Sequence, residues 1–299
     1  MDMLRITDLQ KRFGDKEVLR GLNLSVQEHS IFGFVGKNGA GKTTAMKTVL
    51  GLLKADAGAI TVNGEKVVYG QTTTNRHIGY LPDVPEFYSF MTAPEYLRFC
   101  GEITGMEKAE TAKRGKELLE MVGLEKETHR IKGFSRGMKQ RLGIAQALLN
   151  RPKLLICDEP TSALDPVGRK ETLDILLTVR EQTTVLFSTH ILSDVERICT
   201  DVAFLDNGVI GVQGTLSEIK TRYRREEYRL ETENETDAVA LLQTFPKMKP
   251  IGKTQLTFCE SDHSMFKILH FVSDRRIALL KLERVEPTLE SLFMEVVEK

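Results

Sequence analysis

One short segment of the chain reads Gly36-Lys37-Asn38-Gly39-Ala40-Gly41-Lys42-Thr43-Thr44. It matches the phosphate-loop pattern G-x-x-x-x-G-K-[ST], in which glycines let the backbone curl until successive N–H groups face phosphate oxygens. An apolar run at 31–35 precedes it, and residues with helical periodicity follow it. This strand–loop–helix context is the one that the pattern requires, and a merely structural Gly-rich turn does not need it. The segment therefore predicts a site for the phosphates of a nucleotide.

The positions within this loop carry distinct predicted roles. Lys42 supplies a point charge at the β- and γ-phosphates, and Thr43 supplies a hydroxyl ligand for Mg²⁺. A helix that begins near Thr43 adds the positive end of its dipole. Its apolar residues are Met46, Val49, Leu50 and Leu53, at the spacing of one helix face. The predicted nucleotide-binding residues here are Gly36, Asn38, Gly39, Ala40, Gly41, Lys42, Thr43 and Thr44.

Two carboxylates follow a second apolar run, at 154–157. In the absence of other motifs, Asp158 and Glu159 would indicate only a solvated acidic turn after a strand. With a phosphate loop upstream, Asp158 becomes a candidate Mg²⁺ anchor, and Glu159 a candidate for orienting or deprotonating an attacking water. His190 ends the next predicted strand; a lone histidine is more often structural, but this position favours a γ-phosphate contact.

A second helix start also has the character of a phosphate site. Ser135 is a favourable N-cap, and Gly137 allows a close approach to the helix end. One chain needs only one phosphate loop for each nucleotide that it binds, and the loop at 36–44 already fills that need. We therefore predict that Ser135 and Gly137 serve a nucleotide bound to another subunit.

The order of predicted elements indicates an α/β fold with a mostly parallel sheet. Alternating stretches at 4–9 and 18–26 predict an antiparallel N-terminal hairpin, and a helical subdomain is expected at about 85–150. Of the 23 glycines, Gly252 alone lies beyond Gly214, and the charged turn at 221–227 marks a boundary. We expect a first domain at 1–220 and a small α+β domain, roughly ferredoxin-like, at 221–299.

Composition narrows the functional classes. A chain of 299 residues with 41% hydrophobic and 28% charged residues is typical of a two-domain globular protein. Lys plus Arg and Asp plus Glu both number 42, so a basic surplus for nucleic acid is missing. No apolar run approaches the roughly 20 residues of a membrane-spanning helix, and no secretion signal is expected. The four cysteines form no CxxC, which favours reduced thiols over disulfides or a zinc site.

Taken together, the motifs resemble the ATP-binding cassette (ABC) ATPases over about residues 1–218. The segments that carry the resemblance are, in chain order, 36–44, 135–141, 154–159, 162–165 and His190. The resemblance implies a P-loop NTPase fold of ABC type that binds ATP and Mg²⁺, with two cassettes enclosing two ATP molecules head to tail. By position, Phe13 resembles the aromatic residue that stacks on adenine, although it could instead be a core residue of the hairpin. Asp165 resembles the residue that couples the two sites.

Two departures from the family pattern refine the resemblance. Arg136-Gly137-Met138 stands where the family usually has Gly-Gly-Gln, and Asp83 stands where it usually has Gln. Met138 lacks the hydrogen-bonding amide, whereas Asp83 can face Mg²⁺ through water. Both departures, and the segment 285–293, resemble the branch of exporters for antibiotics such as bacitracin or daunorubicin.

The resulting prediction is the ATPase subunit of an ABC transporter, of the antibiotic or multidrug exporter type. Its partners would be a separate membrane permease and a second ATPase subunit, identical or paralogous, and it would be cytoplasmic and peripheral on the inner face of the membrane. Two alternatives remain: an importer ATPase with a ligand-sensing C-terminal domain, or a soluble ABC ATPase outside transport. Only 116 positions separate Lys42 from Asp158, too few for the coiled coil of a chromosome ATPase. The C-terminal domain could also serve dimer contact alone.

Overall fold

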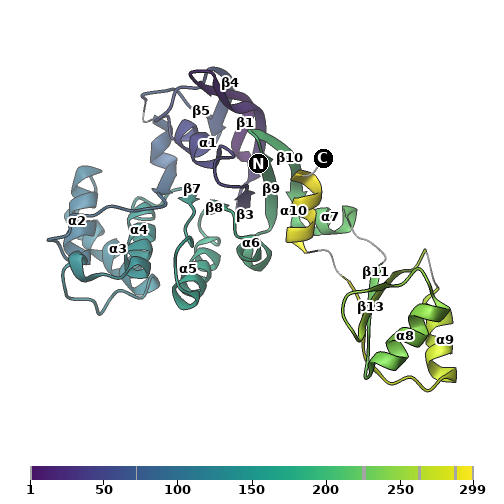
Figure 1. Cartoon of the computed structure of the whole chain (residues 1–299). Helices are drawn as coiled ribbons and strands as arrows, with labels where there is room; N and C mark the ends of the chain where they lie inside the picture. Colours follow the sequence, from purple (N-terminus) through teal and green to yellow (C-terminus); the bar gives the residue numbers. More distant parts are fainter. Residues whose placement is uncertain (1, 72, 224–226, 262–263, 286–287, 298–299) are drawn as a thin grey trace. The chain divides into compact units, whose positions relative to one another are not determined.

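The chain divides into two compact units. The computed structural model describes residues 2–71, 73–223, 227–261, 264–285 and 288–297 (Figure 1). Of the described residues, 2–216 and 295–297 belong to the first unit, and 217–294 form the second. The division between the units therefore lies a few residues before the turn expected at 221–227. Positions 224–226 of that turn lie outside the described residues.

A twisted antiparallel sheet opens the first unit. Its strands lie in the order β2 (Lys16–Gln27), β1 (Asp2–Phe13), β4 (Ala57–Val62) and β5 (Glu65–Lys66). The predicted hairpin is therefore confirmed as β1 and β2, with Phe13 paired to Lys16 at its turn. The strands β4 and β5 were not predicted; they form their own hairpin on β1, around Asn63 and Gly64.

The central sheet carries the strands that the apolar runs predicted. Its order is β10-β9-β3-β8-β7-β6. The bounds are Ile31–Val35 for β3, Ile78–Leu81 for β6, Leu154–Asp158 for β7, Thr184–Thr189 for β8, Asp201–Asp206 for β9 and Val209–Thr215 for β10. All neighbours pair in parallel except β9 and β10, which form a hairpin. Every residue of β3, β7 and β8 is buried, as expected of parallel strands covered on both faces.

Helices cover this sheet and form the predicted helical subdomain. They are α1 (Lys42–Val49), α2 (Ala93–Ile103), α3 (Lys108–Met121), α4 (Arg136–Ala147), α5 (Pro166–Val179) and α6 (Leu192–Ile198), with short 3₁₀ turns at Thr73–His77 and Ile131–Gly133. The helix α1 is shorter than predicted, so Leu53 lies beyond its end. Gly51 adopts φ +69°, the left-handed conformation that ends a helix.

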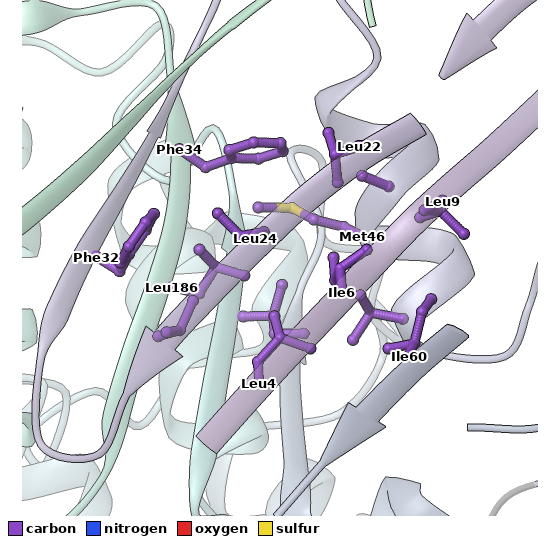
Figure 2. Packing of buried hydrophobic residues seen from close by; sticks show 14 of the residues in the cluster. Leu4, Ile6, Leu9, Leu22, Leu24, Phe32, Phe34, Met46, Ile60 and Leu186 are labelled. Atoms are coloured by element: carbon purple, nitrogen blue, oxygen red, sulfur yellow. The ribbon is translucent and has the colours of Figure 1, made fainter. Parts of the chain in front are cut away.

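One hydrophobic cluster joins the two sheets of the first unit. Figure 2 shows Leu4, Ile6 and Leu9 of β1 packed with side chains of β2, β3, β4 and α1. Met46 of α1 lies within this cluster and is almost fully buried. Burying each such side chain contributes roughly 1.5–3 kcal/mol. The start of α1, and with it the Gly-rich loop, is therefore anchored from both sheets.

The second unit is an α+β domain, as predicted. Its elements are α7 (Leu216–Arg222), β11 (Glu227–Thr232), α8 (Glu235–Thr244), β12 (Lys249–Pro250), β13 (Gln255–Cys259), α9 (Met265–Asp274) and β14 (Leu279–Arg284). The last helix, α10 (Leu289–Val297), begins in this unit, and its residues from 295 onward are assigned to the first unit. The antiparallel sheet has the order β12-β13-β11-β14. A β-α-β-β-α-β chain order with this strand order is the ferredoxin-like arrangement. Its core contains Leu230, Leu241, Leu256 and Ile268.

Nowhere in the described part of the chain is there a helix with both the length and the apolar character needed to cross a membrane.

Candidate active site

The Gly-rich loop connects β3 to α1 and is held by contacts that only glycine permits. A Cβ on Gly36 would lie 2.6 Å from the Leu205 carbonyl oxygen. Gly41 adopts φ +113°, and a Cβ there would lie 2.9 Å from a methyl group of Leu19. Both positions therefore exclude larger residues, and the loop is fixed against β2 and β9.

Lys42 is buried beneath this loop. Its Nζ donates hydrogen bonds to the carbonyl oxygens of Gly36, at 2.6 Å, and Lys37, at 3.3 Å. The same nitrogen lies 3.0 Å from Glu159 Oε1. These contacts hold one positive charge between the loop and the end of β7, where a phosphate group would meet it.

Two oxygen groups of the kind that Mg²⁺ prefers as ligands, the Thr43 hydroxyl and the Asp158 carboxylate, meet next to Lys42. Thr43 Oγ1 donates to Asp158 Oδ2 at 2.7 Å, and Ser188 Oγ donates to Asp158 Oδ1 at 2.5 Å. Asp158 is buried at the end of β7. One hydroxyl and one oriented carboxylate suit Mg²⁺, which takes few protein ligands and completes its shell with water and phosphate oxygens. Among the described residues, no cluster of three or more His, Cys, Asp or Glu suited to a metal occurs.

Glu159 lies in a strained turn directly after β7. Its φ of +48° is unusual for a residue with a side chain, and its N–H donates to Ser188 Oγ at 3.0 Å. Glu159 Oε2 lies 2.9 Å from His190 Nδ1. With Lys42 at one oxygen and His190 at the other, the carboxylate is held in one orientation. Strain of this kind costs about 1–3 kcal/mol and persists where the surroundings determine the backbone.

Lys42, Thr43, Asp158 and Glu159 line one open cavity of about 560 Å³. It is bounded by Phe13, Lys16, Val18, Asn38, Gly39, Gly41, Lys42, Thr43, Thr44, Asp83, Asp158 and Glu159. Phe13 is 49% exposed, which argues against its being a core residue of the hairpin. Lys11 Nζ lies 5.2 Å from the centre of its ring. The structure thus brings the loop, the two carboxylates and an accessible aromatic ring to one place.

Six predicted residues are not among those that bound this cavity: Gly36, Ala40, Ser135, Gly137, Asp165 and His190. Ser135 Oγ accepts from the Met138 N–H at 3.2 Å and caps α4, while Asp165 Oδ1 accepts from the Gly168 N–H at 3.0 Å and caps α5. A Cβ on Gly137 would meet only Ser135 Oγ, at 3.9 Å. Nothing among the described residues of this chain therefore requires glycine at that position.

Asp83 lies between two cavities. It lines the cavity of Lys42 and also a second one, of about 480 Å³, with Arg136 and Lys139. Its Oδ1 accepts from Ser162 Oγ at 2.8 Å and lies 3.9 Å from the Arg136 guanidinium. The two departures from the family pattern, Asp83 and Arg136, are thus neighbours in space.

Ser188 is a site residue that the sequence did not single out, and Ser162 was named only as part of the segment 162–165, without a role of its own. Ser188 is fully buried in β8, and it contacts both Asp158 and the Glu159 backbone. A polar residue inside an apolar strand next to His190 is the signal that could have found it.

Comparisons with known proteins show which family this chain resembles. Residues 19–162 match the family model described as ABC transporter, and residues 214–297 match that of the ATP-binding protein DrrA1-3-like C-terminal domain. The ABC transporter ATP-binding protein YxlF of Bacillus subtilis (strain 168) is 38% identical over 99% of this chain and 99% of its own. The bacitracin transport ATP-binding protein BcrA of Bacillus licheniformis is 40% identical over 81% of this chain and 78% of its own. Among solved structures, an ATP-binding subunit of an ABC transporter matches with 34% identity and a TM-score of 0.66, covering 74% of this chain and 93% of that one.

Proposed function

Because this chain belongs to the family of ABC transporter ATP-binding proteins and is an ATPase, we propose that it powers an exporter of antibiotic or multidrug type. It would drive a separate membrane permease through the ATP-dependent pairing of two ATPase subunits. Family membership carries the ATP binding and hydrolysis. The exporter type, the separate permease and the pairing of subunits are proposals that go beyond family membership.

The match of the second unit carries the exporter assignment. Residues 214–297 resemble the C-terminal domain of DrrA1-3-like ATP-binding proteins, so the likeness extends well beyond the cassette. The relative named for bacitracin transport aligns over 81% of this chain. The Asp83 and Arg136 departures point to the same branch.

Binding of the nucleotide would rest on three sets of residues, one each for the phosphates, the adenine ring and Mg²⁺. The backbone N–H groups of the Gly-rich loop, the start of α1 and the Lys42 ammonium would hold the phosphates. Phe13 would stack on the adenine ring. Thr43 and Asp158 would hold Mg²⁺, with Asp83 contributing through water. Held there, a Mg²⁺ ion would neutralise charge on the β- and γ-phosphate oxygens.

Glu159 would act as the base in hydrolysis. A water oxygen bonds to the γ-phosphorus while the bond from that phosphorus to the bridging oxygen of ADP breaks. Glu159 accepts the proton that the water loses. The 2.9 Å contact with His190 supports a role for the imidazole in orienting this carboxylate and reaching the γ-phosphate. Lys42 would balance the charge that develops on the transferred group.

The pairing of subunits is inferred from the residues outside the cavity. Ser135 and Gly137 lie at an exposed helix start that this chain's own cavity does not use. Two copies arranged head to tail would bring that helix start to the γ-phosphate of the partner, with Asp165 beside the junction. ATP would then favour the closed pair, because it contacts both subunits. Hydrolysis would release the pair and return the permease to its other state. The chain would accordingly be cytoplasmic and peripheral on the inner face of the membrane.

Capture of the partner tests this proposal. Tagged Glu159→Gln protein would be incubated with ATP and mildly solubilised native membranes, recovered, and identified with its partners by mass spectrometry. We expect a stoichiometric polytopic membrane protein, absent when Lys42→Ala is the bait. Ribosomal or DNA-bound partners without a membrane protein would refute the transport assignment. Recovery of a permease together with a solute-binding protein would instead favour the importer.

A further inference from the structure

A buried carboxylate outside the cavity ties together the segments that carry the proposed hydrolytic residues. Asp194, in the first turn of α6, is 1% exposed. Its Oδ2 accepts from Thr161 Oγ1 at 2.6 Å, and its Oδ1 accepts from Arg169 Nε at 2.5 Å. A buried charge is tolerated when it is paired and hydrogen-bonded, and here both oxygens have a partner.

Each partner of Asp194 belongs to a different functional segment. Thr161 is two residues after Glu159, and the next residue along, Ser162, donates its N–H to the Glu159 carbonyl oxygen at 3.1 Å. Arg169 is one turn after Asp165, and its N–H donates to the Asp165 carbonyl oxygen at 2.9 Å. Asp194 itself is four residues after His190. One carboxylate therefore joins the Glu159 turn, the start of α5 and the loop of His190.

The backbone of the Glu159 turn needs such support. Glu159 and Ala163, on either side of Thr161, have φ values of +48° and +55°. Residues with side chains hold this conformation only where their surroundings determine it. The Thr161 hydroxyl is buried, and Asp194 is the acceptor that fixes it. A small displacement of this turn would move the Glu159 carboxylate relative to Lys42 and His190.

We propose that Asp194 is a positioning residue for ATP hydrolysis, which acts through Thr161 and Arg169 on the placement of Glu159 and His190. The inference rests on the proposed role of Glu159 and adds a residue remote from the nucleotide cavity. Misplacing a reacting group by about 1 Å can lower a rate by as much as 10²-fold. Loss of the Asp194 charge should therefore lower kcat while leaving ATP binding intact.

The chain offers a matched control for this substitution. Arg197 of α6 donates to Asp174 Oδ1 of α5 at 2.8 Å, so this exposed pair joins the same two helices without reaching the Glu159 turn. We expect Asp194→Asn to lower kcat about 10- to 100-fold with the KM for ATP within about twofold. Asp174→Asn should leave both parameters within about twofold. Equal loss of kcat in the two variants would mean that α5–α6 packing alone is responsible, and would overturn the proposal.

A double-mutant cycle separates positioning from general damage. In a Glu159→Gln background, where the base is gone, Asp194→Asn should lower the residual single-turnover rate by less than about twofold. The same factor as in the wild-type background would overturn the proposal. A wild-type rate in Glu159→Gln alone would instead refute the proposed role of Glu159, so the two failures remain distinguishable.

Thr161 provides the test if Asp194→Asn does not fold. Thr161→Ser keeps the hydroxyl donor and should keep kcat within about threefold. Thr161→Val keeps the shape and removes the donor, and should reproduce the loss expected of Asp194→Asn. Equal kcat values for the serine and valine variants would overturn the proposal.

Discussion

Glu159 and His190, from the ends of the neighbouring parallel strands β7 and β8, are in direct contact, with 2.9 Å between Oε2 and Nδ1. The other oxygen of Glu159 lies 3.0 Å from Lys42 Nζ. The two contacts hold the carboxylate in one orientation, which the role proposed for Glu159 as general base requires. The carboxyl ends of parallel strands meet at one edge of a sheet, so the topology itself brings these residues together.

Replacing Glu159 by glutamine should separate binding from hydrolysis. The amide keeps the size of the side chain but accepts no proton, so we expect turnover to fall about 10²-fold or more while ATP still binds. Phosphate release and a fluorescent-nucleotide titration would measure the two properties. The exposed Glu181→Gln serves as control and should retain the wild-type rate. Wild-type turnover in Glu159→Gln would refute the proposed role of Glu159 as the base.

Replacing Lys42 by alanine should abolish nucleotide binding. The buried ammonium is fixed by two loop carbonyl oxygens, so alanine removes a positive charge that is held in place in the cavity. Ligand binding raises the melting temperature by mass action, so ATP should stabilise the wild type but not Lys42→Ala. The exposed Lys54→Ala should keep the full ATP-dependent shift. Tight ATP binding by Lys42→Ala would refute the phosphate-loop assignment.

Much of the fold could be predicted from the sequence because its signals are local. Apolar runs became β3, β7 and β8, and the Asn207-Gly208 dipeptide became the β9–β10 turn. The Gly-rich loop was recognisable because Gly36 and Gly41 meet the backbone and side chains of other strands, which leaves little freedom of sequence at these two positions. The mostly parallel sheet, the helical subdomain and the C-terminal α+β domain are confirmed.

Other features depend on contacts that a pattern does not record. The strand β4 was missed because its burial alternates only at its end, although Asn63-Gly64 after it is the same turn signal that located β9 and β10. The start of α5 was also missed, despite the Asp165-Pro166 cap. The Asp194 network joins residues 33 positions apart, and no spacing rule predicts such a contact.

Gly137 should be dispensable for folding and required for turnover. A Cβ there meets only Ser135 Oγ, at 3.9 Å, and an acidic residue near a helix start is favourable. Gly137→Asp should therefore keep the melting temperature within about 2 °C and lose turnover at least about tenfold, because its carboxylate would repel the partner's phosphate. In a Glu159→Gln background it should also prevent ATP-dependent pairing, measured by size-exclusion chromatography.

Gly79 provides a comparison with Gly137, because substitution of Gly79 should destabilise the fold. A Cβ on Gly79 would lie 2.2 Å from the Ala147 carbonyl oxygen of α4. Gly79→Ala should therefore lower the melting temperature by several degrees, since overpacking costs about 1–3 kcal/mol. Normal turnover and pairing in Gly137→Asp would contradict a role for this helix start across the pair.

Alkaline pH should destabilise the protein partly through a buried thiol. Burial raises the pKa of the Cys157 thiol well above its usual value, and the charge of Asp158 adds a smaller effect in the same direction. The unfolded thiol titrates near pH 8.5, so above that pH the unfolded state holds fewer protons and the free energy of unfolding falls. The contribution of Cys157 is complete below pH 8.5 and decreases by up to about 1.4 kcal/mol per pH unit above it. Urea midpoints between pH 7.5 and 10 should decline less steeply in Cys157→Ala, and equal slopes would contradict the assignment.

The two acidic residues proposed for Mg²⁺ should differ in how strongly they affect its binding. Asp158 is buried and joined to Thr43 at 2.7 Å, whereas Asp83 is half exposed and already accepts from Ser162. In Mg²⁺ titrations of ATPase activity, Asp158→Asn should raise the half-maximal concentration about 10- to 100-fold, and Asp83→Asn only about two- to fivefold, because a contact through water is weaker. The remote Asp174→Asn should leave it unchanged. An unchanged Mg²⁺ requirement in Asp83→Asn would remove Asp83 from the metal site and leave it as the acceptor that joins Ser162 to Arg136.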